Sequence, residues 1–223
     1  MRIISGTARG RRLLSPAKHT GNLPGQILIR PTADRAREAL FNIIGPLVED
    51  AAVLDLFAGT GALGLEALSR QARLAVFVDQ QHQAVELIQR NVALCGFSTR
   101  ARVIRRDLTK GLSFLVPYAL TVNSCSRGHC KESSSAGLGE VRPDPGFSLV
   151  FIDPPYGKGL GILVLAALIT AGLLAPQALA VVEDAARETL PDAVGTMRLA
   201  DQRRYGDTGF WLYRFCSPAV TAG

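Results

Sequence analysis

Short apolar runs alternate with stretches of helical length along the middle of the chain. Five of the runs have the length of a buried strand, and they span residues 53–57, 74–78, 102–104, 149–152 and 179–182. Three segments between them have the length and pattern of helices, at residues 62–70, 81–94 and 160–171. Strands that alternate with helices in this way predict an α/β fold, in which helices cover both faces of a parallel sheet.

The two ends of this region have patterns of their own. Residues 31–49 are predicted to form a helix that Thr32 caps, because an apolar stripe follows at Leu40, Phe41, Ile43 and Ile44. Near the end of the chain, residues 197–204 and 210–215 are joined by a turn over residues 205–209 and indicate a hairpin. We therefore expect a seven-stranded, mostly parallel sheet with an antiparallel C-terminal hairpin.

One segment without charge has the length of a membrane span. It runs for 24 residues from Gly159 to Val182. Gly172, Pro176 and Gln177 interrupt it, so a buried helix followed by a buried parallel strand explains the pattern better. We expect no membrane-spanning segment.

Residues 121–146 break the alternation. They are rich in Ser, Gly and Pro, which predicts a flexible surface insertion on the opposite rim of the sheet from residues 153–156. Cys125, His129 and Cys130 lie within it, but no fourth ligand follows at a spacing typical of zinc sites, so no metal site is expected.

Cysteine content and the first residues indicate a cytoplasmic protein. Four cysteines in a chain of 223 residues do not make a disulfide scaffold, which fits a reducing compartment. The first residues, MRIISGTARGRRLL, lack the apolar core of a signal peptide. No heptads or repeats indicate self-association, so we expect a monomer.

Positive charge is concentrated at the start of the chain. Residues 1–37 hold eight basic residues and one acidic residue, whereas the rest holds 17 basic and 18 acidic residues. A basic arm on a nearly neutral body is typical of a protein that binds a polyanion. Nucleic acid is the first expectation, and an anionic membrane surface is the second.

A glycine-rich segment follows the first predicted strand. Gly59, Gly61 and Gly64 have the G-x-G-x-x-G spacing of dinucleotide-binding proteins, and Asp79 lies 20 residues beyond Gly59. The carboxylate of Asp55, just before this turn, would repel a pyrophosphate. It would attract a cofactor that carries an ammonium group and a sulfonium and no phosphate, which favours S-adenosylmethionine.

Two further acidic residues follow the next predicted strands. Asp79 ends the second strand, where its carboxylate can accept hydrogen bonds from ribose hydroxyls. Asp107 follows the third strand, where it can reach the amino group of an adenine. Both positions fit the adenosine half of the cofactor.

The sequence Asp153-Pro154-Pro155-Tyr156 directly follows the fourth predicted strand. Consecutive prolines fix the backbone and leave carbonyls that only accept hydrogen bonds. The Asp153 carboxylate is another acceptor, and Tyr156 offers a ring on which a base can stack. This combination suits an exocyclic amine held with its nitrogen lone pair toward a methyl donor, so that catalysis rests mainly on positioning.

Together these motifs resemble the RsmD family of bacterial 16S rRNA guanine-N2 methyltransferases. Four segments carry the resemblance: MRIISGTARGRRL at the start, RPTADRAREALFNI at residues 30–43, DLFAGTGALGLEALSR at residues 55–70, and FIDPPY at residues 151–156. RRYGDTGFWLY at residues 203–213 is a weaker match. Residues 121–146 depart from the family, in which a short connection is usual.

The resemblance implies a class I methyltransferase fold and a set of site residues. The cofactor would be held by Asp55, Phe57, Ala58, Gly59, Thr60, Gly61, Asp79, Asp107, Arg30 and Thr32. The target guanine would be held by Asp153, Pro154, Pro155 and Tyr156. The rRNA phosphates would lie on Arg9, Arg11, Arg12 and Arg35.

The expected organisation is a basic RNA-binding arm over residues 1–29, a methyltransferase domain over residues 30–216, and a disordered tail over residues 217–223. The expected partner is 16S rRNA in a small-subunit particle. The main alternative is a DNA adenine-N6 methyltransferase, although the short arm offers little with which to read a DNA sequence. Asp55 and the residue 153–156 motif disfavour a nicotinamide-dependent oxidoreductase, and the two intact motifs disfavour a non-catalytic binding module.

Overall fold

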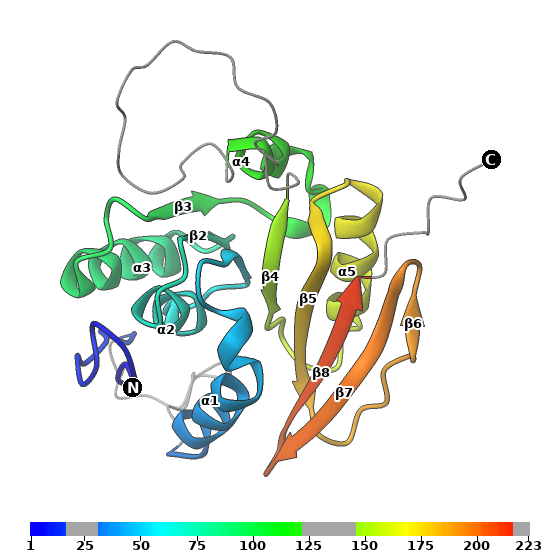
Figure 1. Cartoon of the computed structure of the whole chain (residues 1–223), viewed down its shortest axis with the longest axis horizontal. Coiled ribbons are helices and arrows are strands. Elements are labelled where there is room, and N and C mark those ends of the chain that lie inside the picture. The colour runs from blue at the N-terminus through cyan, green and yellow to red at the C-terminus, as the bar shows by residue number, and fades with distance from the viewer. Residues whose placement is uncertain (17–30, 122–145, 216–223) are drawn as a thin grey trace, which may run out of the picture.

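The protein is an α/β structure built on one mixed sheet (Figure 1). The computed structural model describes residues 1–16, 31–121 and 146–215. The sheet order is β3-β2-β1-β4-β5-β8-β7-β6, in which β1 to β5 are parallel to one another, and β8 pairs antiparallel with both β5 and β7, as β6 does with β7. The strands are β1 Ala52–Leu56, β2 Leu74–Asp79, β3 Ala101–Arg105, β4 Phe147–Ile152, β5 Leu174–Ala185, β6 Ala193–Val194, β7 Met197–Tyr205 and β8 Thr208–Phe215.

Helices cover both faces of this sheet. Three helices pack on one face, namely α1 Pro31–Ile44, α2 Ala62–Ser69 and α3 His82–Cys95. The other face carries α4 Val116–Thr121 and α5 Leu160–Thr170. Short 3₁₀ helices lie at Gly45–Leu47, Leu108–Lys110 and Ser113–Leu115.

Two apolar cores lie on the two faces of the sheet. Successive residues of a strand point to opposite faces, so Val53 joins the core beneath α1 to α3 and Leu54 joins the core beneath α5. All five residues of β1 are buried. Burial on both faces explains why the parallel strands are nearly continuous apolar runs in the sequence.

The predicted fold class is confirmed, with a different strand count. The sheet has eight strands instead of seven, because Ala193–Val194 forms a short strand that pairs with Met197 and Arg198 across a tight turn. Two residues are too few to give a pattern of alternation in the sequence. The short helix α4 and the 3₁₀ helices were also not predicted.

The helix predicted over residues 31–49 begins at the predicted residue, but its predicted cap and its predicted end were wrong. Helix α1 begins at Pro31, so Thr32 lies inside its first turn and is not its cap; proline suits a first helical position because it lacks the N–H that would be unpaired there. The helix ends at Ile44, and a 3₁₀ turn containing Pro46 follows.

Strand β5 begins earlier than predicted. It starts at Leu174, and its pairing with β4 jumps from Phe147↔Leu174 to Leu149↔Leu179. Gln177 sits in this irregularity with a φ of 58°. The predicted interruption at Pro176 and Gln177 is therefore a bulge within the strand.

The uncharged run from Gly159 to Val182 forms α5 and most of β5, as predicted. Within the described parts of the chain, every helix is too short or too polar to cross a bilayer. Residues 122–145 of the predicted insertion, with its three possible metal ligands, lie outside the described residues, while Thr121 is the last residue of α4.

The start of the chain is a small hairpin packed on α2. Arg2 and Arg12 form an antiparallel bridge, and Ile3, Ala8 and Leu13 are buried in the core beneath α1 to α3. The first 14 residues of the predicted arm therefore pack on the domain, and residues 17–29 lie outside the described ranges.

Glu66 on α2 anchors this hairpin. Its side chain is fully buried, and its carboxylate accepts hydrogen bonds from the backbone N–H groups of Ile4 (2.7 Å) and Ser5 (3.0 Å). The guanidinium of Arg70 donates to the same carboxylate at 2.8 Å. Each partner offsets the loss of hydration that burial of the carboxylate brings.

Replacing Glu66 by alanine should destabilise the protein by about 3 kcal/mol, because two backbone donors and a guanidinium lose their acceptor. Urea unfolding measures this change, and Glu49→Ala on the surface is the control. Hydrogen exchange should also show faster exchange at Ile4 and Ser5. Unchanged exchange at these two amides would contradict the role of Glu66 as the anchor.

Candidate functional site

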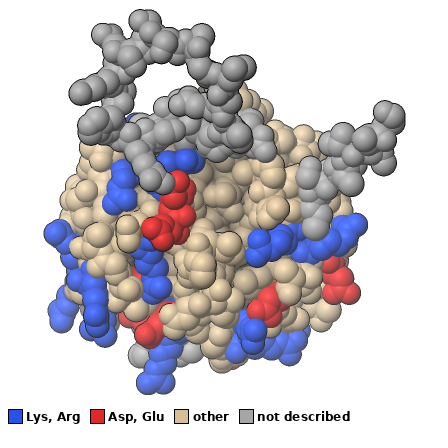
Figure 2. Space-filling model, in the orientation of Figure 1, with Lys and Arg blue, Asp and Glu red and all other residues tan. Residues whose placement is uncertain are grey.

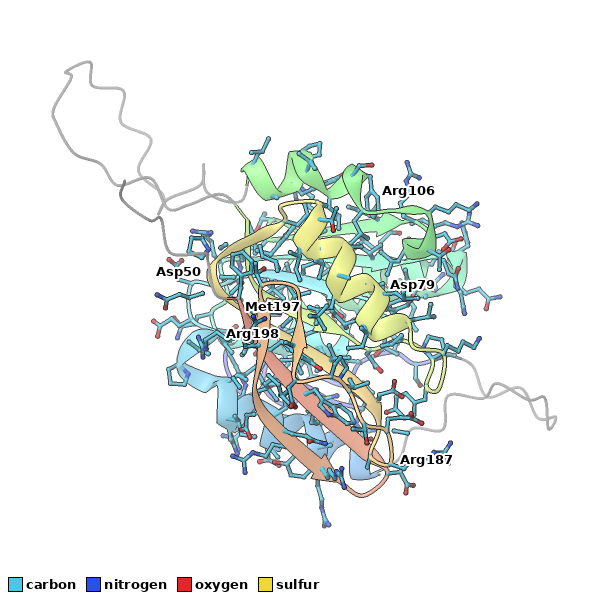
Figure 3. All side chains as sticks on the ribbon, turned by 90° about the vertical axis from the view of Figure 1, so that its right-hand side faces the viewer. Asp50, Asp79, Arg106, Arg187, Met197 and Arg198 are labelled. Atoms are coloured by element: carbon cyan, nitrogen blue, oxygen red, sulfur yellow. The ribbon has the colours of Figure 1, made fainter. Side chains whose placement is uncertain are left out.

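The predicted site residues gather at the carboxyl edge of the parallel strands. Strand β1 lies between β2 and β4, so the chain continues to one side after β1 and returns to the other side for β4. Such a reversal opens a crevice at the carboxyl ends of the strands, which is where α/β proteins bind ligands. Figure 3 shows this polarity: Asp79, Arg106 and Arg187 lie on one side of the molecule, and Asp50 and Arg198 lie on the other.

The glycine loop forms the turn between β1 and α2. Gly59 and Gly61 have φ values of 56° and 76°, which favour glycine. Phe57 also has a positive φ, of 58°, which is uncommon for a bulky residue and is typical of functional loops. The N–H of Gly59 donates to Asp79 at 3.0 Å, so the loop is fixed to the end of β2.

The third glycine of the motif allows α2 to lie close to the sheet. A Cβ on Gly64 would lie 2.4 Å from the ring of Phe77 and 3.0 Å from Oδ2 of Asp55. The backbone N–H of Gly64 donates to that Asp55 oxygen at 2.8 Å. The spacing of the motif therefore places the N-terminus of α2 against the Asp55 carboxylate.

Asp55 is a buried carboxylate that has no ion-pair partner within residues 1–16, 31–121 and 146–215. Its residue is 1% exposed, and the N–H of Gly64 is its hydrogen-bond donor among the described residues. Burial raises the pKa of Asp55 from 3.8 to about 7, and the negative charge of Asp79 adds to this effect. A cationic ligand would remove this unfavourable burial, so the site fits the ammonium group of S-adenosylmethionine.

Asp79 and Asp107 are both held in place by local donors. The two oxygens of Asp79 accept from the N–H groups of Gln81 (2.9 Å) and Gly59 (3.0 Å), and each keeps a second lone pair for a ligand. Asp107 accepts from the backbone and hydroxyl of Thr109, at 3.0 and 2.6 Å. These bonds lower the pKa of Asp107, so its carboxylate is ionised at neutral pH.

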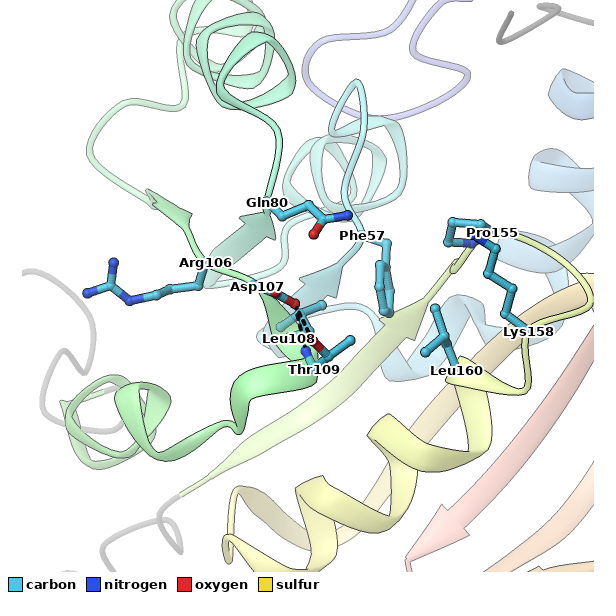
Figure 4. Close-up of a pocket in the computed structure, with 9 residues that line it drawn as sticks. All are labelled: Phe57, Gln80, Arg106, Asp107, Leu108, Thr109, Pro155, Lys158 and Leu160. Atoms are coloured by element: carbon cyan, nitrogen blue, oxygen red, sulfur yellow. Dashed lines mark hydrogen bonds between the residues drawn. The ribbon is translucent and has the colours of Figure 1, made fainter. Parts of the chain in front are cut away.

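A pocket opens beside these residues (Figure 4). Its lining is mainly apolar and includes Phe57, Gln80, Arg106, Asp107, Leu108, Thr109, Pro155, Lys158 and Leu160. An apolar slot with a few polar groups at its rim suits a flat heterocycle. Six of these residues were not predicted, although each lies within a few positions of a predicted site residue: Gln80, Arg106, Leu108, Thr109, Lys158 and Leu160.

Asn91 was also missed by sequence reasoning. It is fully buried on α3, and its amide nitrogen donates to the backbone carbonyls of Thr60 (2.9 Å) and Leu14 (3.1 Å). Its amide oxygen accepts from the N–H of Leu14 at 2.7 Å. This one side chain therefore joins the glycine loop to the N-terminal hairpin.

The loop after β4 brings Asp153 and Tyr156 to the same crevice. The N–H of Asp153 approaches the carbonyl of Leu56 at 3.4 Å, which places Asp153 next to the end of β1. Tyr156 is 42% exposed, and its hydroxyl donates to Oε1 of Glu183 at 2.6 Å. The N–H of Gly157 donates to Asp184 at 3.3 Å, so two successive residues of the loop are held by two successive residues of β5.

Negative charge accumulates around Asp153. Burial and the charges of Glu183, Asp55 and Asp184 raise the pKa of Asp153 well above its usual range. Burial and Asp184 raise the pKa of Glu183 as well. Carboxylates with raised pKa values in a crevice are typical of functional sites.

Comparison with known proteins agrees with this geometry. The family model described as conserved hypothetical protein 95 matches residues 1–117 and 118–214. The chain belongs to this family. The resemblance that the sequence motifs predicted is thereby confirmed.

A named relative and a solved structure are similar to most of the chain. The chain is 33% identical to ribosomal RNA small subunit methyltransferase D of Escherichia coli K12 over 214 residues, which cover 96% of this chain and 89% of that protein. The solved structure of the putative methyltransferase yhhF from Escherichia coli has a TM-score of 0.72 and 31% identity, covering 98% of this chain and 99% of that chain.

A more distant structure confirms the fold alone. The RNA methyltransferase from Salinibacter ruber, solved with S-adenosyl-L-homocysteine, has a TM-score of 0.56 at 10% identity and covers 86% of this chain and 97% of that chain. The class I methyltransferase fold predicted for this member of the conserved hypothetical protein 95 family is confirmed.

The remaining predicted site residues lie on the surface or outside the residues that the structure describes. Arg9, Arg11 and Arg12 are exposed on the N-terminal hairpin, and Arg35 is exposed on α1. Figure 2 shows Lys and Arg side chains along the left and lower edges of one face and in a row on its right. Arg30 lies outside the described residues, as does the side chain of Thr32.

Proposed function

We propose that this protein transfers a methyl group from S-adenosylmethionine to the exocyclic N2 amine of a guanine in 16S rRNA of the small ribosomal subunit. The observation that carries this proposal is the meeting, at one sheet edge, of the buried Asp55 carboxylate, which no described cation pairs with, and the loop of Asp153 to Tyr156. The name of the Escherichia coli relative, ribosomal RNA small subunit methyltransferase D, supports the choice of substrate.

Three carboxylates would hold the cofactor. Asp55 would bind its ammonium group, Asp79 would accept from its ribose hydroxyls, and Asp107 would accept from its adenine amino group. Phe57 and the backbone of Ala58 to Gly61 would form the loop around it, with Arg30 and Thr32 closing over it. Bound S-adenosylmethionine would supply an electrophilic methyl group on its sulfonium.

The loop after β4 would hold the target amine. Pro154 and Pro155 fix the backbone so that its carbonyls accept hydrogen bonds, and Asp153 provides a second acceptor. Tyr156 provides the exposed ring on which the base stacks. With both amine hydrogens held, the nitrogen lone pair turns out of the plane of the base and would bond to the methyl carbon as the carbon–sulfur bond breaks. Asp153 would stabilise the positive charge that develops on nitrogen and accept the proton that the nitrogen then loses.

The alternative, a DNA adenine-N6 methyltransferase, uses the same fold and a similar loop. We favour rRNA because the relatives whose names give a substrate are rRNA methyltransferases and because the basic residues of the predicted arm lie on a short hairpin. A target base inside folded RNA has to be extruded to enter the crevice. We further propose that the protein acts as a monomer in the cytoplasm on a small-subunit particle.

Transfer of label from S-adenosylmethionine tests this function. Unmodified small subunits, naked 16S rRNA and duplex DNA are offered in parallel, and the products are digested to nucleosides. Label in N2-methylguanosine from RNA is the expected result. Label in N6-methyladenine from DNA would overturn the substrate, and absence of label from all three, with the cofactor bound, would overturn the proposal.

Neutralising Arg9, Arg11 and Arg12 together should weaken RNA binding and flatten its salt dependence. Each phosphate contact releases counterions, so loss of three contacts should reduce the slope of log K against log salt by about 2. Filter binding over a range of salt concentrations measures the slope. Arg198→Gln, at the opposite end of β7 from the site, should leave it unchanged. An unchanged slope in the triple variant would remove the hairpin from the RNA interface.

A further inference from the structure

We propose that Glu183 is a specificity-determining residue, which together with Asp153 selects guanine by accepting hydrogen bonds from its N1–H and N2 amine. This inference rests on the proposed function, because it names the residue that recognises the substrate at the same site. Neither the sequence motifs nor the family resemblance pointed to Glu183.

The register of the sheet places the two carboxylates side by side. Ile152 on β4 pairs with Val182 on the parallel strand β5, so Asp153 and Glu183 follow at the same level. Side chains alternate along strands, and Phe151 and Val181, two positions earlier, both lie in the core beneath α1 to α3. Asp153 and Glu183 therefore project toward that same face of the sheet.

One hydrogen bond fixes Glu183 and leaves an acceptor free. Its Oε1 accepts the hydroxyl of Tyr156 at 2.6 Å, which ties it to the ring on which the base would stack. Its Oε2 has no hydrogen-bond partner, and the carboxylate has no ion pair, among the residues that the structure describes. Glu183 thus has an acceptor beside Asp153, at the edge of the stacking ring.

The hydrogen-bonding edge of guanine matches two adjacent acceptors. Guanine presents two donor groups side by side, N1–H and the N2 amine. Adenine presents one amine next to an unprotonated N1, which is an acceptor and would face the Glu183 carboxylate. An acceptor placed against an acceptor rejects the wrong base, which is a common device of specificity. Asp153 alone would accept either amine, so the choice between the bases falls to Glu183.

A guanine analogue that lacks the N1–H tests this role. After the methylated nucleotide has been mapped, the target guanosine is replaced by 2-aminopurine riboside, which keeps the N2 amine but has an unprotonated N1. The wild-type protein should prefer guanosine in kcat/KM by a factor on the order of 10², because the analogue places its unprotonated N1, an acceptor, opposite the Glu183 carboxylate. The substrate is whichever form, naked rRNA or reconstituted subunit, accepts the label.

Glu183→Gln should reduce this preference at least tenfold. The glutamine side chain can donate from its amide to the N1 of 2-aminopurine, so methylation of guanosine falls while methylation of the analogue falls less or rises. The analogue also lacks the O6 oxygen, but this loss affects wild type and variant alike and cancels in the comparison. Glu49→Gln, on the surface, should retain the wild-type preference.

Tyr156→Phe separates recognition from simple support of the loop. It removes the hydroxyl that Glu183 holds but leaves the carboxylate, so the rate should fall while the preference for guanosine is kept. If Glu183→Gln lowered kcat/KM for guanosine and for the analogue by the same factor, Glu183 would only position Tyr156, and the proposal would be overturned. Failure of wild-type protein to make N2-methylguanosine at all would instead overturn the proposed function.

Discussion

Asp153→Ala is expected to abolish methyl transfer while leaving cofactor affinity nearly unchanged. The residue lies at the end of β4, next to β1, and offers the acceptor that would orient the target amine. Loss of a group that acts on charge developing in the transition state lowers kcat by about 10²–10⁴-fold. Single-turnover methyl transfer and calorimetric binding of S-adenosylhomocysteine measure the two effects separately.

Asp153→Asn is the matched variant, because it keeps an acceptor and removes the charge. It should retain more activity than alanine, and Glu49→Ala should behave as wild type. A large loss of cofactor affinity in either Asp153 variant would place Asp153 in the cofactor site instead. An active Asp153→Ala variant would move amine recognition to the proline carbonyls.

The asparagine variant should also be more stable than wild type at alkaline pH. The pKa of Asp153 is raised in the folded protein, so the folded state binds a proton more tightly than the unfolded state does. The contribution of protonated Asp153 to the free energy of unfolding is therefore present at low pH, and it is lost as pH rises through the pKa that Asp153 has in the folded protein. Thermal unfolding at several pH values would show the two curves separating as pH increases.

The sequence predicted those parts of the fold that depend on local patterns. Residues 53–57 and 149–152 are apolar runs because their strands are buried on both faces, so the strands were found within a few residues. The site acids Asp55 and Asp153 were found because they interrupt or end such runs, where an acid has no structural reason to be. Parallel strands bring their carboxyl ends to one edge, so the gathering of these acids followed from the alternation alone.

The parts that were missed depend on tertiary contacts. Glu183 ends an apolar run as Asp153 does, but its relation to Tyr156 becomes visible only with the β4–β5 register. Glu66 and Asn91 look like polar residues on the exposed faces of helices, yet the N-terminal hairpin covers both. No periodicity within α2 or α3 signals a segment that arrives from elsewhere in the chain.

Cofactor affinity should depend on pH through Asp55. In the free protein the pKa of Asp55 is about 7, so below neutral pH the carboxylate is protonated and must lose its proton to bind an ammonium group. We expect the affinity for S-adenosylhomocysteine to fall about tenfold for each pH unit below 7 and to level off above it. Calorimetry between pH 5 and pH 8 measures this, in buffers of different ionisation enthalpy to count the protons released.

Asp55→Asn should flatten this dependence and weaken binding at pH 8 by roughly 10²–10³-fold, because the buried ammonium loses its counter-charge. The same variant should be more stable than wild-type protein without ligand. In wild type, stability is lost as pH rises from the unfolded-state pKa of 3.8 toward about 7, with a penalty of up to about 4 kcal/mol that asparagine does not incur.

These opposite effects on stability and binding separate a ligand-binding role of Asp55 from a structural one. If Asp55 served only to receive the N–H of Gly64, then asparagine, which also has an acceptor oxygen, would change binding little and leave its pH dependence intact. A variant that is more stable, binds less tightly and no longer responds to pH would instead mean that the fold keeps an unfavourable buried carboxylate for the cation it receives.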